Sequence, residues 1–126
     1  MQDTQAGYGR NDGEARMEII WSDLANQNLD SILDYVEENF GATIANKTLR
    51  KIGKKVSGLI NFPESGVLDR KYSTEEYSVH HFTIDPNVVY YMLYPDAIVI
   101  GVIVHTKQSP KTVDKILKNF LEHYER

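Results

Sequence analysis

The first half of the chain begins with a short apolar run that is typical of a strand. Two stretches follow in which apolar residues recur with the period of an α-helix. Residues 18–21 read Glu-Ile-Ile-Trp, which is typical of a strand, and Ser22 is suited to cap a following helix. Two stretches then place apolar residues at spacings of three and four: Ala25, Leu29, Ile32, Val36 and Phe40, then Ala45, Leu49, Ile52, Val56 and Leu59. Gly41 separates the stretches and Pro63 follows the second, so the pattern predicts an antiparallel helical hairpin.

After residue 76, the pattern of apolar side chains changes to one that is typical of strands. Residues 77–84, 88–94 and 97–105 are rich in β-branched and aromatic side chains, with turn sequences between them. Gly101 marks a bulge or a close approach by a helix, and Ser109-Pro110 begins a last amphipathic helix that reaches Tyr124. We expect an α+β domain: an N-terminal strand and helical hairpin packed on a three- to four-stranded antiparallel sheet, then a C-terminal helix, with the helices against one side.

Composition narrows the class of protein. The chain of 126 residues is the length of one domain, and residues 1–16, with three glycines and few aliphatic side chains, predict a flexible leader before a domain at 17–126. The absence of cysteine excludes disulfides and thiolate metal sites. No apolar run is long enough to span a bilayer, and a signal peptide is not recognisable, so we expect a cytoplasmic protein without membrane contact. The net charge of −4 argues against a general nucleic-acid binder.

The ordered set of motifs resembles the ParE-like branch of the RelE/ParE toxin superfamily. In the first half, the similarity lies in the strand ending in an aromatic residue and serine, the Phe40-Gly41 corner, and Phe62-Pro63 with Gly66. In the second half, it lies in a tyrosine strand, a Val-Tyr-Tyr strand, and a last strand ending in His105 and a basic residue. The resemblance covers about residues 17–124. It implies the toxin of a type II toxin–antitoxin system (a plasmid stabilisation protein), held inactive by a cognate antitoxin.

The resemblance leaves two toxic mechanisms open, because RelE-like members cleave mRNA on the ribosome and ParE-like members inhibit DNA gyrase. RelE-like enzymes place cations on the sheet face, and alignment puts those positions at Ser78, His80, Asn87 and Lys107. Two of the four lack charge, which leaves few groups to stabilise a charged phosphorane. His80, Lys107 and His105 are therefore candidate catalytic residues only if the chain is a ribonuclease; otherwise His80 and His105 are structural hydrogen-bonding groups. We expect a non-enzymatic gyrase inhibitor, with an mRNA endoribonuclease or a degenerate, non-toxic family member as alternatives.

Metal and cofactor sites are not expected. His80, His81 and His105 fall on neighbouring predicted strands, but no acidic residue at ligand spacing accompanies them. His80 and His81 are adjacent in one strand, so they face opposite sides of the sheet.

Charge is divided between the two helices of the hairpin. The first helix is acidic, and the second carries five cations within nine residues, Lys47, Arg50, Lys51, Lys54 and Lys55. These are either two solvated faces with pairing at the rim, or a basic face that docks an acidic antitoxin segment or a nucleoprotein target. Tyr90, Tyr91 and Tyr94 are expected either at an exposed sheet edge or groove that accepts a partner peptide, or, for at least one of them, in the core. The candidate residues for binding target or antitoxin are Lys47, Lys51, Lys54, Tyr90, Tyr91, Lys111 and Lys115. Both a homodimer and a toxin–antitoxin hetero-oligomer remain open.

Overall fold

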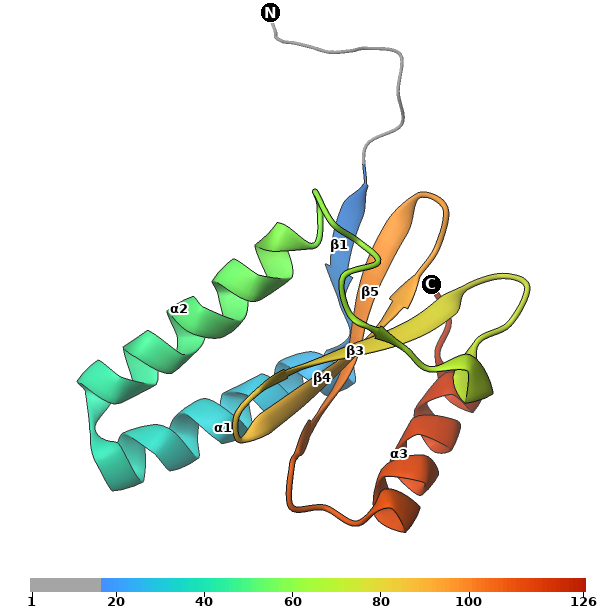
Figure 1. The fold of residues 1–126 in the computed structure, drawn as a ribbon. Coiled ribbons are helices and arrows are strands. Elements are labelled where there is room, and N and C mark those ends of the chain that lie inside the picture. The colour runs from blue at the N-terminus through green and yellow to red at the C-terminus, as the bar shows by residue number, and fades with distance from the viewer. Residues whose placement is uncertain (1–16) are drawn as a thin grey trace, which may run out of the picture.

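The computed structural model describes residues 17–126, so the predicted leader at 1–16 lies outside the described residues. The elements follow one another as β1 (Glu18–Trp21), α1 (Asp23–Phe40), α2 (Ala42–Gly58), β2 (Val67–Leu68), the short 3-10 helix η1 (Arg70–Tyr72), β3 (Ser78–Ile84), β4 (Asn87–Leu93), β5 (Ala97–His105) and α3 (Pro110–His123) (Figure 1). This confirms the α+β class and the predicted order of strand, two helices, three strands and helix. None of the helices in this part of the chain is long and apolar enough to cross a membrane.

The sheet has five strands in the order β1-β5-β4-β3-β2 and is mixed, whereas three or four antiparallel strands were predicted. β1 runs parallel to β5, with Ile20 opposite Val99, and all other neighbours are antiparallel. Local sequence does not specify the direction of β1, because its partner β5 lies more than 70 residues away. β2 contains two residues only, too few for a strand pattern to be recognised.

Helices cover both faces of the sheet, so the prediction of helices on one side is wrong. The hairpin of α1 and α2 packs on one face, with Ile52 and Leu59 against Tyr91 and Ile100 in the core. α3 covers the other face, where its apolar residues meet those of β3, β4 and β5. The reason lies in β5, whose residues 97–104 are all buried. A strand that is apolar on both sides requires a cover on both sides.

Two serines cap helices, and Ser22 and Gly101 also set how α1 and α3 meet the sheet. Ser22 Oγ accepts a hydrogen bond from Ala25 N (2.9 Å) and donates one to Gly101 O (2.7 Å), so it caps α1 and ties it to β5. The pairing of β4 with β5 skips Gly101, and a Cβ there would lie 2.8 Å from the Phe120 ring of α3. Both predictions for Gly101, a bulge and a close helix approach, are confirmed. Ser109 caps α3 as predicted, accepting from Thr112 N (3.2 Å).

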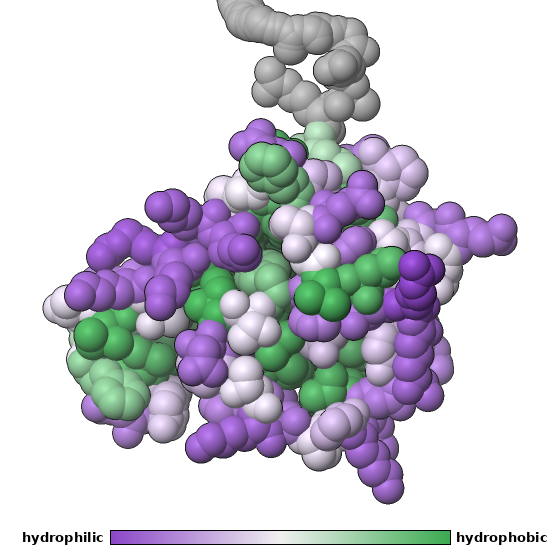
Figure 2. All heavy atoms as spheres, in the orientation of Figure 1, coloured by the Kyte–Doolittle hydropathy of each residue, from purple (hydrophilic) through white to green (hydrophobic). Residues whose placement is uncertain are grey.

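The far end of the hairpin extends past the sheet. Gly41 joins the helices with φ at +93°, which glycine adopts without strain. Phe40 and Leu49 were predicted on buried faces but are 63% and 43% exposed, and Tyr35 is 62% exposed. Figure 1 shows this end of the hairpin projecting away from the strands, and Figure 2 shows hydrophobic side chains gathered there. These residues keep the helical period but have no sheet beneath them.

Candidate functional site

A groove runs along α2 between the hairpin and the β3 side of the sheet. Its larger part is a cavity of about 890 Å³ between the hairpin tip and the β3–β4 turn. Its smaller part, about 440 Å³, lies toward Phe62 and shares the lining residues Lys51 and Ile84 with the larger one, so the two parts adjoin each other. We call these two adjoining hollows together the α2 groove. The apolar side chains of its larger part are Ile32, Tyr35, Val36, Phe40, Ile44, Ile84 and Pro86.

Basic residues line one wall of the α2 groove. Lys47 and Lys51 line the larger part, and Lys51, Lys54 and Lys55 line the smaller part. Within residues 17–126 none of these four forms an ion pair, and Lys55 lies over the Phe82 ring at 5.8 Å. The pairing across the hairpin that was considered from the sequence is therefore not present among the described residues. Figure 2 shows hydrophilic side chains along α2 beside the hydrophobic tip.

The predicted tyrosines do not lie in the α2 groove. Strand β4 lies between β3 and β5, so the prediction of Tyr90 and Tyr91 at an exposed edge is wrong, and the alternative of core packing is confirmed for Tyr91. Tyr91 is fully buried, and burial raises its pKa. Tyr90 faces the α3 side, half-buried, with its ring 5.2 Å from that of His81.

The remaining predicted cations belong to a separate surface. Lys111 and Lys115 lie on α3, across the sheet from the α2 groove, and both are exposed. On the same helix, Asp114 accepts a hydrogen bond from Tyr72 (2.5 Å) and pairs with Lys71 (2.9 Å). The hydrogen bond from Tyr72 contributes most, and the contact with Lys71 contributes next, to holding the pKa of the Asp114 carboxyl well below its usual range. The candidate lysines are thus divided between two faces of the molecule.

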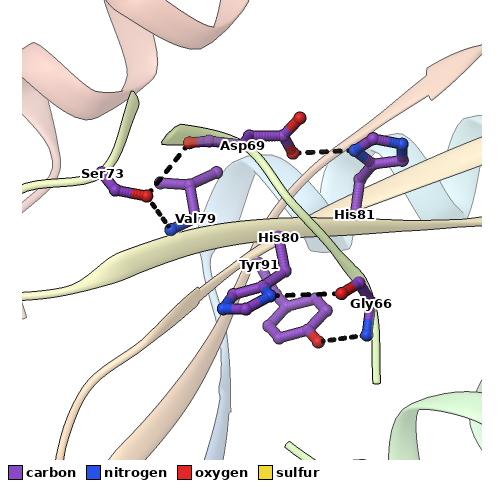
Figure 3. A network of polar contacts seen from close by, with 7 residues as sticks. All are labelled: Gly66, Asp69, Ser73, Val79, His80, His81 and Tyr91. Atoms are coloured by element: carbon purple, nitrogen blue, oxygen red, sulfur yellow. Dashed lines mark hydrogen bonds and ion pairs between the residues drawn. The ribbon is translucent and has the colours of Figure 1, made fainter. Parts of the chain in front are cut away.

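His80 is a structural residue in this fold. It is 3% exposed, and its ring stacks on that of Tyr91 at 5.2 Å (Figure 3). Its Nδ1 lies 3.3 Å from Gly66 O and its Nε2 lies 2.9 Å from Ser78 Oγ. A carbonyl only accepts, so Nδ1 carries a proton and donates to Gly66 O, while Nε2 contacts the Ser78 hydroxyl. The imidazole therefore holds the segment before β2 against the sheet.

His81 points to the opposite face, as predicted from alternation. Its Nδ1 lies 2.7 Å from Asp69 Oδ2 (Figure 3). Ser73 Oγ donates to Asp69 O (3.0 Å) and accepts from Val79 N (2.9 Å). These contacts fasten the segment after β2, so the two histidines secure both ends of the edge strand.

The candidate ribonuclease residues are not gathered in one place. Lys107 N donates to His105 Nδ1 (3.0 Å), so these two residues are adjacent and exposed at the end of β5. His105 is level with Asn87, and Asn87 with Ile84. His80 is four residues from Ile84, about 13 Å along the strand. Among residues 17–126, no three His, Cys, Asp or Glu side chains are grouped as a metal site.

Asn87 is a groove residue that sequence reasoning placed differently. In the alignment with RelE-like enzymes, Asn87 occupies a position at which those enzymes carry a cation. In the structure it is 6% exposed and lines the α2 groove between the β3–β4 turn and α1. Asparagine after proline is typical of an exposed turn, so no signal in the sequence indicated that Asn87 is buried.

Most of the sequence matches a known protein family. The family model described as the ParE toxin of the type II toxin–antitoxin system parDE matches residues 19–110. The chain belongs to the ParE toxin family. It is therefore a ParE-like toxin of a type II system, as the resemblance implied, and its partner is a cognate antitoxin.

A solved structure shares the fold. A chain of the chromosomal ParDE toxin–antitoxin system from P. aeruginosa superposes with a TM-score of 0.58 at 23% identity. The match covers 71% of this ParE-like chain and 96% of the other. No curated protein matches the sequence.

Proposed function

We propose that this ParE-like toxin acts in the cytoplasm by binding and inhibiting DNA gyrase, without cleaving nucleic acid. The observation that carries the proposal is the position of His80. It is buried, stacked on Tyr91 and hydrogen-bonded to Gly66 O, and it is separated by more than 10 Å of strand from Lys107 and His105. RNA cleavage through the 2′-hydroxyl requires a base, an acid and a cation around one phosphate. That arrangement is not present among these residues.

The cognate antitoxin is proposed to neutralise the toxin from the α2 groove. The groove combines an apolar floor with lysines that form no ion pair among the described residues. The basic surface of α3, with Lys111 and Lys115, remains on the other side of the sheet and is a candidate contact for gyrase. Opposite charge on the antitoxin would speed the encounter more than it would tighten the complex.

The test begins with expression of the toxin alone in a bacterium and pulse labelling of DNA and protein synthesis over the first minutes. DNA synthesis should fall first, and purified toxin should then inhibit supercoiling by purified gyrase. The ribonuclease alternative predicts instead that protein synthesis falls first and that Lys107→Ala or His105→Ala abolishes toxicity. Unchanged synthesis of both kinds would identify a degenerate, non-toxic member.

A further inference from the structure

We infer that a ridge of lysines at the start of α3 binds the phosphate backbone of duplex DNA. The α3 ridge consists of Lys107, Lys111 and Lys115, which lie just before α3 or on its first two turns. DNA is the molecule on which gyrase acts, so the inference deepens the proposed function by naming what this side of the toxin contacts. It rests on the gyrase proposal only for the part that the contact plays in toxicity.

The α3 ridge presents positive charge to solvent. Lys111 and Lys115 are four residues apart and therefore lie on the same face of the helix. Lys107 precedes them in the loop after β5, and all three side chains are exposed. Within residues 17–126 none of the three forms an ion pair.

The carboxylate nearest to the α3 ridge along the chain already has partners. Asp114 is the one acidic residue between positions 107 and 118. It accepts a hydrogen bond from Tyr72, and it pairs with Lys71 (2.9 Å) and with Lys118 (3.2 Å). Two lysines therefore share this carboxylate, and the charge of the ridge itself is left without a counterpart there.

Helix stability does not explain the lysine in the first turn of α3. The N-terminal end of a helix carries partial positive charge, so a cation there is unfavourable and an acid is favourable. The first turn of α3 contains Lys111 and has no acidic residue. The attachment of α3 to the sheet comes from its opposite, buried side, which contains Leu117 and Phe120. An anionic partner converts the unfavourable charge into an attraction.

The composition of the surface favours DNA over a protein as this partner. In the described part of the chain, the exposed large hydrophobic side chains lie on the hairpin, on the loop after it and on β2, and none lies on α3. Protein interfaces are centred on apolar and aromatic side chains and are poor in lysine. Contacts with the DNA backbone instead use exposed cations, which meet phosphate oxygens without reading the sequence.

The spacing of the α3 ridge sets the expected strength of binding. Lys111 and Lys115 are about 6 Å apart along the helix axis, and duplex DNA carries one negative charge per about 1.7 Å of its length. Each of the three lysines can therefore meet its own phosphate. Three contacts predict that the association constant falls with salt at a logarithmic slope of about −2.7. The net charge of −4 opposes binding at longer range, so we expect weak affinity for DNA unless gyrase holds the two together.

The experiment measures binding of the full-length toxin to fluorescent duplexes of about 20 base pairs by anisotropy, between about 50 and 200 mM NaCl. The association constant should fall about 40-fold over this range, and two duplexes of unrelated sequence should bind within about twofold of each other. No binding at the lowest salt, or a slope near zero, would overturn the inference.

Charge reversal tests which lysines are responsible. Lys115→Glu should weaken binding at least about fivefold and should make the salt slope shallower by about one. Arg50→Glu makes the same charge change on α2, across the sheet, and should alter affinity less than about twofold. Equal effects of these two variants would show that net charge alone is responsible, and would refute the ridge.

Lys111→Glu separates binding from stability. It should weaken DNA binding as Lys115→Glu does, because it removes a phosphate contact. It should also raise the melting temperature by about 2 °C, because an acid suits the first turn of a helix. Weaker binding accompanied by a lower melting temperature would indicate damage to the fold and would count against the assigned contact.

Gyrase is judged separately, by the supercoiling assay and by binding of the toxin to gyrase without DNA. Lys115→Glu should bind gyrase alone as the wild type does, but should need about fivefold more toxin to inhibit supercoiling. Loss of binding to gyrase alone would show that the ridge contacts the protein, and would overturn the inference. DNA binding without inhibition leaves the inference standing and refutes gyrase as the target, whereas inhibition without DNA binding does the reverse.

Discussion

Replacing Tyr91 by phenylalanine removes one hydroxyl from beneath the segment that leads into β2. The hydroxyl donates to Pro63 O (2.7 Å) and accepts from Gly66 N (3.0 Å). The ring, which is fully buried and stacked on His80, is unchanged by the substitution. The variant therefore isolates two hydrogen bonds that join the loop after α2 to the centre of the sheet.

The expected loss is about 1–2 kcal/mol of unfolding free energy. Leaving a buried donor or acceptor without a partner costs about 1–3 kcal/mol, but Pro63 and Gly66 are only half-buried, so water partly replaces the hydroxyl. For a domain of this size each kcal/mol lowers the melting temperature by about 4 °C. Tyr91→Phe should therefore melt about 4 to 8 °C below the wild type.

Thermal and urea denaturation followed by circular dichroism measure this loss, with Tyr90→Phe as the matched control. Tyr90 lies next in the chain and is half-buried, but its hydroxyl makes no hydrogen bond among the described residues. Its loss should change the melting temperature by less than about 2 °C. Hydrogen exchange at the Gly66 amide should accelerate in Tyr91→Phe alone. Equal shifts in the two variants, or an unchanged Gly66 exchange rate, would refute the assigned role of the hydroxyl.

Three further changes test how the helices are joined to the sheet. Gly101→Val directs a side chain into the Phe120 ring and should destabilise the domain by about 1–3 kcal/mol in urea denaturation, with partial recovery in the double variant with Phe120→Leu. Ser22→Ala removes both the cap of α1 and the bond to Gly101 O, and should lower the unfolding free energy by about 1–2 kcal/mol in the same assay. Asp114→Asn weakens the contacts with Tyr72 and Lys71, so it should lower the melting temperature at pH 7. The carboxyl pKa is depressed in the folded state, so this contribution is present above the ordinary pKa, and the gap from wild type should narrow as pH falls below about 4.

Local signals account for the parts of the fold that were predicted. The helix caps of Ser22 and Ser109 and the dihedral angle of Gly41 involve only residues a few positions away, so these roles can be read from a short window of sequence. The alternation in β3 likewise placed His80 and His81 on opposite faces. Such features depend on the local pattern of residues and not on contacts with residues distant in the sequence.

The features that were missed depend on contacts between distant residues. The parallel pairing of β1 with β5 and the position of β4 at the centre of the sheet follow from topology, and they decide that Tyr91 is buried rather than exposed. His80 and Lys107 have side chains that could act together in catalysis, so the sequence suggested that they share one site. The register of β3, β4 and β5 places them far apart. The ParE-type resemblance supplied the family, whereas the placement of each candidate residue required the structure.

The α2 groove exists because the hairpin is longer than the sheet that it covers. Near β5 the helices bury Ala25, Ile52 and Leu59, but beyond the β3–β4 turn the same helical period presents Tyr35 and Phe40 to solvent. Exposed apolar residues in a contiguous hollow are unfavourable for a protein alone and are typical of a surface completed by a partner. A shorter hairpin would preserve the core and lose the groove. The projecting tip and the buried Asn87 side of the β3–β4 turn therefore meet at one hollow, and this exposed apolar surface is what favours the groove over the α3 surface as the antitoxin site.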